Sequence, residues 1–159
     1  MPAAAHRLRP ARLEDLAAVL PWAPDAEAVR LWAGPNLGFP VEPARLWADV
    51  HKSPGTAFVL CAASTGEIVG FGQVMHREAD YAHLARVIVA PSHRGEGVGR
   101  TLARELMRVA PTFLPVRWCS LYVYPENTRA YALYRSLGFV ETRRERGFLR
   151  MEAPLDVAR

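Results

Sequence analysis

Three glycines at alternate positions, Gly95, Gly97 and Gly99, lie between a strand-like apolar run and a helical pattern. Glycine lets backbone N–H groups converge and lets a ligand approach without meeting a Cβ atom. The N-terminus of a helix adds unpaired N–H donors and partial positive charge, and the two features together favour a phosphate group. The segment 94–99 therefore predicts a site for a ligand that carries phosphate.

Two common nucleotide-binding loops do not match this segment. A Walker A loop needs Gly-Lys-Ser/Thr, but Gly99 is followed by Arg100 and Thr101, so the lysine that reaches the terminal phosphates is missing. A dinucleotide fingerprint, GxGxxG, fails because Leu102 stands where the third glycine belongs. That fingerprint also opens a parallel βαβ unit, whereas this segment follows an antiparallel run of strands. Both nucleotide-binding classes are excluded.

The composition is that of one ordinary globular domain spanning residues 1–159. Half of the residues are hydrophobic and 23% are charged, and a chain of this length can bury one self-sufficient core. No apolar run approaches the ~20 residues that a membrane-spanning helix needs, and the first residues do not form a secretory signal. Cys61 and Cys119 lack the CxxC or histidine spacing of a metal site. We expect a cytoplasmic protein without metal or membrane contact.

The basic charge balance does not indicate nucleic-acid binding. The formal net charge is +4, but the basic residues are scattered instead of gathered in one run. A modest positive surplus also suits a small polyanionic ligand. We therefore expect no nucleic-acid partner.

The patterning predicts a mixed α/β fold with short helices first and a sheet after them. Leucines at helical spacing follow Leu13, with Glu14 and Asp15 in the first turn, where the helix dipole favours negative charge. The apolar second half of the run 81–90 is typical of a strand buried on both faces. We expect strands at 7–12, 56–63, 68–76, 81–90 and 117–124, helices at 13–20, 25–33, 43–50, 98–109 and 126–137, and a closing hairpin at 139–151.

Two motifs in this order resemble the GNAT superfamily of acyl-CoA-dependent N-acetyltransferases. Residues 94–99, RGEGVG, fit the family signature (Q/R)xxGx(G/A), and residues 127–139, NTRAYALYRSLGF, are similar to its NxxAxxxYxxxGF segment. Nearly the whole element order matches as well. The resemblance implies one GNAT-like domain, with a mostly antiparallel twisted sheet that contains a splayed pair of parallel strands and is flanked by helices.

The resemblance also implies acetyl-CoA as cosubstrate and assigns residues to it. The pyrophosphate is expected on the backbone of the glycine loop, and the pantetheine arm between the splayed strands. The expected cofactor-binding residues are Val87, Ile88, Val89, Arg94, Gly95, Glu96, Gly97, Val98, Gly99 and Asn127.

The chemistry implied is direct attack of a primary amine on the thioester. A backbone N–H of the central strand then stabilises the oxyanion. Tyr134, the motif tyrosine, is the expected acid that protonates the departing thiolate. Asn127 lies two helical turns before it, so both side chains can share a side. Two structural alternatives stay open, namely that Asn127 only caps the helix and that Tyr134 is only a half-buried core aromatic.

The general base is less sharply indicated. Protein N-terminal acetyltransferases of this family often carry a glutamate where this chain has Tyr122. His83 lies on the central strand and its imidazole titrates in a useful range, so it is the candidate base. A hydrogen-bonded structural role for His83, or a water relay in its place, stays open. Glu78 and Asp80 flank a turn and are expected to be solvated.

The acceptor is expected to be a small amine or an amino-acid-like molecule. Trp32, Phe39 and Tyr122 are the candidate acceptor-binding residues, because the segment between the first helices lines the acceptor site in relatives. Cys119 alternates with its strand neighbours and is expected to be an inert core thiol. Protein N-terminal or lysine acetylation, and a catalytically silent acyl-CoA-binding domain, are the alternatives. A homodimer is common in the family.

Overall fold

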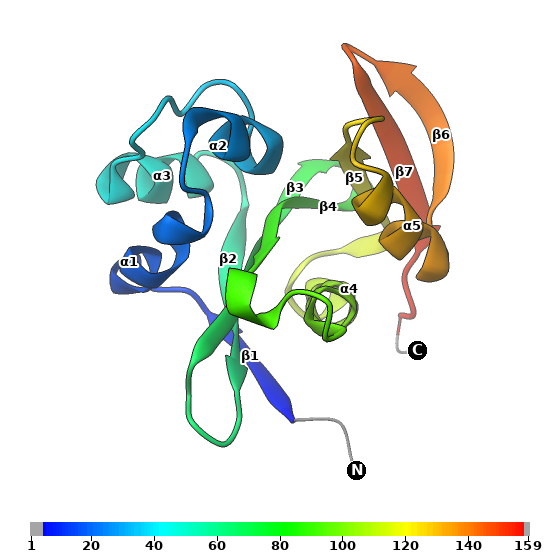
Figure 1. Cartoon of the computed structure of the whole chain (residues 1–159). Coiled ribbons are helices and arrows are strands. Elements are labelled where there is room, and N and C mark those ends of the chain that lie inside the picture. Colours follow the sequence, from blue (N-terminus) through cyan, green and yellow to red (C-terminus); the bar gives the residue numbers. More distant parts are fainter. Residues whose placement is uncertain (1–4, 158–159) are drawn as a thin grey trace.

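The computed structural model of the chain describes residues 5–157, which form a mixed α/β domain around one sheet. Within these residues the sheet has seven strands in the order β1-β2-β3-β4-β5-β7-β6 (Figure 1). The β4 and β5 strands are parallel, and the other neighbours are antiparallel. The strands are β1 (His6–Pro10), β2 (Gly55–Ala62), β3 (Ile68–Glu78), β4 (Asp80–Val89), β5 (Val116–Val123), β6 (Val140–Glu145) and β7 (Phe148–Pro154).

Helices cover the two faces of the sheet in separate groups. Along β2, Phe58 and Leu60 join the apolar cluster that contains α4, while Val59 and Cys61 join the cluster that contains α1, α2 and α3. No helix within residues 5–157 has both the length and the hydrophobicity that crossing a bilayer requires. The helices are α1 (Leu16–Val19), α2 (Ala26–Ala33), α3 (Pro43–Val50), α4 (Val98–Phe113) and α5 (Thr128–Ser136), with short 3-10 turns at Leu13–Asp15, Leu20–Trp22 and Pro91–His93.

The parallel strands β4 and β5 separate halfway along β4. Their ladder ends at the pair Leu84–Leu121. At the same place β4 bulges away from the register of β3, and Arg86 has the left-handed φ of +52°. The expectation that the second half of β4 is buried on both faces is wrong, because residues 87–89 are only half-buried along the splay. The splayed parallel pair that the family resemblance implied is confirmed.

Two glycines of β3 let α4 lie close against the sheet. A Cβ atom at Gly72 would meet Leu106 Cδ1 at 2.6 Å, and one at Gly70 would meet Leu102 Cδ2 at 3.0 Å. Both leucines are fully buried on the inner side of α4. This close approach sets the N-terminus of α4 beside the splayed half of β4.

The first predicted helix, 13–20, is broken into a 3-10 turn, a single turn of α-helix and a second 3-10 turn. Asp15 is buried and accepts hydrogen bonds from the Arg9 guanidinium at 2.8 and 2.9 Å and from the Arg12 backbone at 2.7 Å. Its role is therefore an ion pair that joins β1 to the helical layer. The second predicted helix is confirmed, since Asp25 caps it through Ala28 N–H at 2.8 Å.

Candidate active site

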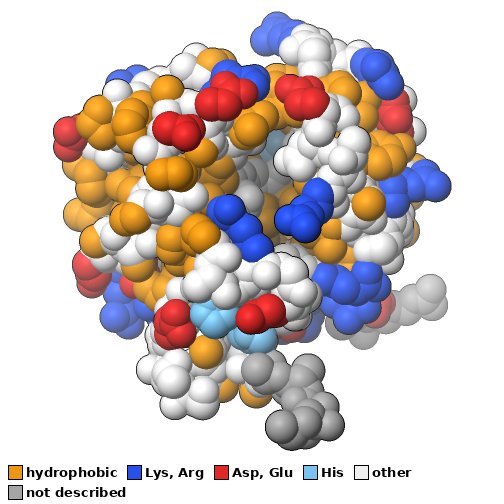
Figure 2. Space-filling model, viewed as in Figure 1, with side chains coloured by type: hydrophobic (Ala, Val, Ile, Leu, Met, Phe, Trp, Pro, Cys, Tyr) orange, Lys and Arg blue, Asp and Glu red, His pale blue; other side chains and the backbone are white. Residues whose placement is uncertain are grey.

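A cavity of about 290 Å³ lies where β4 and β5 separate. Its walls come from α2, β3, β4, β5, α5 and the start of β7. The space-filling view shows a hollow on this face, with Lys or Arg side chains at its mouth (Figure 2). The structure brings six site residues predicted from the sequence to this cavity: Trp32, His83, Val87, Tyr122, Asn127 and Tyr134.

The cavity runs through the plane of the sheet. Val123 and Tyr134 belong to the apolar cluster on the α4 side, whereas Trp32 belongs to the cluster on the α1–α3 side, and all three line the cavity. Such a passage exists only because the β4–β5 ladder stops at Leu84. Two ligands can therefore meet inside it after entering from opposite faces.

The glycine loop stands on the α4 side of this passage. Gly95 and Gly97 have φ values of +82° and +81°, and nothing lies within 4 Å of where their Cβ atoms would be. The first backbone hydrogen bond of the helix runs from Thr101 N–H to Gly97 O, so the amides just before Thr101 have no partner within the helix. Open space and free donors at a helix N-terminus fit the predicted diphosphate site.

Side chains at the loop are held away from its amides. Arg94 Nε donates to Val89 O at 3.2 Å, which ties the loop to the splayed end of β4. His93 bridges Glu96 at 3.1 Å and Glu67 at 3.3 Å, and these hydrogen bonds raise the pKa of His93. The Glu96 carboxylate therefore faces a histidine that is more readily protonated. Sequence reasoning missed His93, although it lies directly before the 94–99 motif.

The bulge in β4 is held from three directions. Trp32 Nε1 donates to Arg86 O at 2.8 Å, and the Arg86 guanidinium binds Asp49 of α3 and Gln73 Oε1 of β3. Gln73 in turn donates to Val50 O at 3.1 Å. These contacts fix an arginine in a backbone conformation that L-residues rarely adopt. Because of the bulge, the edge of residues 87–89 faces the splay.

Tyr134 and Asn127 both reach the cavity from α5. Tyr134 is 8% exposed and its ring meets Phe139 edge-on, with ring centres 5.6 Å apart. Burial raises the pKa of Tyr134, so its hydroxyl stays protonated. Asn127 Oδ1 caps α5 by accepting from Ala130 N–H at 3.2 Å. The capping and core roles therefore both hold, together with contact to the cavity.

His83 reaches the cavity from β4. Its Nδ1 is 3.0 Å from Ser120 Oγ on β5, and its ring centre is 5.1 Å from that of Tyr122. Burial lowers the pKa of His83 to about 4, with further lowering by the charges of Arg77 and Arg150. The imidazole is therefore neutral near pH 7.

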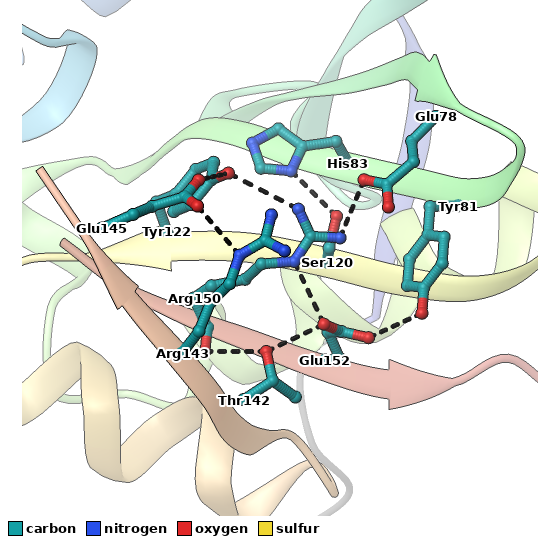
Figure 3. Close-up of polar contacts among 10 residues, drawn as sticks. All are labelled: Glu78, Tyr81, His83, Ser120, Tyr122, Thr142, Arg143, Glu145, Arg150 and Glu152. Carbon is teal, nitrogen blue, oxygen red and sulfur yellow. Dashed lines mark hydrogen bonds and ion pairs between the residues drawn. The ribbon is translucent and has the colours of Figure 1, made fainter.

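A polar network surrounds Arg150 next to His83 (Figure 3). Arg150 is 4% exposed and donates to Glu78 at 2.9 Å and to Glu152 at 3.1 Å. The Tyr122 hydroxyl donates to Glu145, and Tyr81 donates to Glu152 at 2.7 Å. The expectation that Glu78 is merely solvated is wrong, because Arg150 binds it. Sequence reasoning missed Arg150, whose partner is 72 residues away.

The remaining predicted residues lie in different settings. Val87 lines the cavity, whereas Ile88 pairs with Phe71 on the β3 side. Phe39 is 49% exposed and is not among the residues that line the cavity. Cys119 is fully buried in the core, and burial raises the pKa of its thiol, as expected of an inert residue.

Comparisons with known proteins agree with this geometry. The chain is 37% identical over 67 residues to spermidine N(1)-acetyltransferase of Vibrio cholerae, and the aligned segment covers 42% of this chain and 36% of that protein. It is 29% identical over 137 residues to spermidine N(1)-acetyltransferase of Escherichia coli, and this alignment covers 84% of this chain and 72% of that protein.

Solved structures share the fold over nearly the full length. Spermidine N-acetyltransferase from Vibrio cholerae, in complex with CoA and spermine, superposes with a TM-score of 0.76 at 24% identity, covering 94% of this chain and 95% of that one. The ribosomal-protein-S18-alanine N-acetyltransferase from Escherichia coli gives a TM-score of 0.71 at 24% identity, covering 97% and 96%.

The sequence profile described as "Acetyltransferase (GNAT) family" matches residues 20–139, which include the glycine loop and the α5 motif. The chain therefore belongs to the GNAT family of acetyltransferases.

Proposed function

We propose that this GNAT acetyltransferase transfers the acetyl group of acetyl-CoA to the primary amine of a small molecule by direct attack. The observation that carries the proposal is the cavity through the sheet, which joins the side of the glycine loop to the side of α2. A diphosphate on the loop amides directs the pantetheine arm along residues 87–89 into the splay. The modest volume of about 290 Å³ favours a small acceptor.

The reaction forms a C–N bond and breaks the C–S bond of the thioester. The amine nitrogen attacks the carbonyl carbon, and a backbone N–H at the splayed edge of β4 stabilises the oxyanion. The thiolate leaves with a hydrogen bond and then a proton from Tyr134, whose high pKa keeps the hydroxyl protonated until that moment. A proton from solvent then restores the Tyr134 hydroxyl. The attacking nitrogen loses one proton, which balances the reaction to an amide and a free CoA thiol.

His83 is the proposed first acceptor of that proton. Its ring is neutral near pH 7 and therefore has a free lone pair. Because a pKa of about 4 makes this imidazolium a stronger acid than an ordinary histidine, it passes the proton on to water quickly. The amine itself must arrive in its neutral form, which makes turnover rise with pH up to the pKa of the acceptor amine.

The test combines acetyl transfer with cofactor binding. We expect acetyl-CoA to raise the melting temperature and a panel of primary amines to release free CoA thiol. Gly97→Glu should abolish the thermal shift, because a carboxylate is placed among the amides that receive the diphosphate. Gly147→Glu is the matched control, since Gly147 has the similar φ of +83° and equally open surroundings in the β6–β7 turn. Equal shifts in the two variants would contradict the loop assignment.

A further inference from the structure

The acceptor side of the cavity has an unbalanced positive charge. Among the described residues that line the cavity, Arg77 and Arg86 are cationic, and no aspartate or glutamate is present. Burial is the main cause of the lowered pKa of His83, and the positive charge of Arg77 lowers it further. An acceptor that carries extra ammonium groups would meet repulsion instead of attraction in this space.

Carboxylates do lie near the cavity, but other groups already bind them. Asp49 is held by Arg86 and by Lys52 Nζ at 2.7 Å. The other three belong to the Arg150 network, in which Arg150 binds Glu78 and Glu152 and the Tyr122 hydroxyl binds Glu145. Because each of these carboxylates already has a cation or a hydroxyl donor, it attracts an ammonium group of an acceptor less strongly than a free carboxylate would.

Arg77 differs from the other arginines of this region. Within residues 5–157 it forms no ion pair or side-chain hydrogen bond, whereas Arg86 is bound to Asp49 and Gln73. It lies where β3 bulges, so that two residues, His76 and Arg77, oppose the single residue Ala82. Arg77 is exposed to solvent and lines the same cavity as His83.

We propose that the acceptor is a primary amine that also carries an anionic group, and that Arg77 binds this group. The inference rests on the proposed function, because it names the acceptor class of the same cavity. A guanidinium binds a carboxylate or phosphate through two parallel hydrogen bonds, which would orient the amine as well as hold it. The acceptor would then differ from the spermidine named for the relatives of this chain, since spermidine carries only amines.

The experiment compares kcat/KM for four acceptors of similar size: an amine with a carboxylate, an amine with a phosphate, a neutral amine, and spermidine. We expect one of the two anionic amines to be preferred, and the better of the two identifies the anionic group. Arg77→Gln should lower kcat/KM for that acceptor about ten- to hundredfold more than it changes kcat/KM for the neutral amine. Arg77→Glu should reverse the order and favour spermidine.

Arg117→Gln is the matched control, because Arg117 is an exposed strand arginine that does not line the cavity. Preference of the parent protein for spermidine or the neutral amine, or an unchanged kcat/KM in Arg77→Gln, would overturn the inference and leave amine acetylation intact. Failure of every amine, with acetyl-CoA still bound, would instead contradict the proposed function and remove this inference with it.

Discussion

Tyr134 contributes both to the core and to the cavity. The ring packs against Phe139 in the core, while the residue also lines the cavity where the thioester is expected. Removal of the oxygen alone therefore leaves the packing in place. The change Tyr134→Phe therefore tests the chemistry of the residue without a change of fold.

Tyr134→Phe should lower kcat about a hundredfold, which is the lower end of what general acid catalysis contributes. The thermal shift with acetyl-CoA should stay the same, because the loop amides are untouched. Tyr131→Phe on the same helix is the control, since Tyr131 has only a long contact of 3.4 Å to Glu141 and does not line the cavity. Equal turnover in both variants would remove Tyr134 from the proposed mechanism.

His83 gives a prediction about stability as a function of pH. Its pKa is about 4 in the folded protein, whereas the pKa of an ordinary histidine is 6.5, so below about pH 6.5 the unfolded chain binds a proton that the folded chain excludes. Folding stability therefore falls as the pH drops from 6.5 towards 4, by up to about 1.4 kcal/mol per pH unit. Urea unfolding at pH 7, 6 and 5 should show this slope, and His83→Gln should flatten it. Parallel pH profiles for the two proteins would contradict the buried neutral histidine.

Local spacing indicated some of these residues and not others. The separation of seven positions between Asn127 and Tyr134 predicted a shared side of the helix, and both residues line the cavity. Arg77 and Arg150 carry no such signal, because an isolated arginine in a strand is ordinarily solvated. Their positions follow from a bulge in β3 and from pairing between β5 and β7, and neither can be read from one short segment.

At the scale of elements, a glycine sets how closely β2 and β3 pair beside the cavity. Gly55 begins β2 opposite Met75 with a φ of +132°, and a Cβ atom there would lie 2.1 Å from Val74 O. A backbone oxygen cannot move away as the end of a side chain can. The close pairing therefore depends on the absence of a side chain at Gly55.

Gly55→Ala should destabilise the protein by about 2–3 kcal/mol or more, from backbone strain and overpacking together. Gly66→Ala should cost only about 1 kcal/mol, because its φ of +77° brings strain but nothing lies within 4 Å. The free energies of unfolding in urea provide the comparison. Equal losses of stability in the two variants would mean that backbone strain alone, without the contact to Val74, accounts for the need for glycine at position 55.

Most elements could be predicted from the sequence, and the exceptions have physical causes. Periodicity placed α4, and the Asp25 cap placed α2, because these signals act over one or two turns. Residues 13–22 show helical spacing but form short turns, since Pro21 and the Arg9–Asp15 ion pair determine the local path. The apolar composition of 87–89 does not reveal the splay, which depends on where β5 stops pairing.

At the scale of the whole molecule, the network around Arg150 joins strands that are distant in sequence. Arg150 on β7 binds Glu78 on β3, and Tyr81 on β4 binds Glu152 on β7. These contacts cross the open face of the sheet at the closed end of the splay, where β4 and β5 still pair (Figure 3). The strands β1–β4 and the strands β5–β7 are thus held together where β4 and β5 pair, and they separate beyond Leu84 and Leu121.

This arrangement predicts that CoA protects the open end of the sheet from hydrogen exchange. Beyond Leu84 and Leu121 the facing edges of β4 and β5 share no ladder, so their amides should exchange by local fluctuation in the free protein. A pantetheine arm lying along residues 87–89 covers them.

We expect saturating CoA to slow exchange at 87–89 and at 122–123 more than in the ladder segment 80–84. At a CoA concentration of 100 times Kd, binding raises the free energy of global unfolding by about 2.7 kcal/mol. Protection at residues 87–89 and 122–123 is compared with this global gain. Adenosine 3′-phosphate 5′-diphosphate, which carries the diphosphate without pantetheine, is the control and should protect only the glycine loop 94–99. If CoA protects the glycine loop but residues 87–89 exchange as fast as with the nucleotide control, the splay is not the path of the pantetheine arm. Protection of these amides requires a group that lies between the strands.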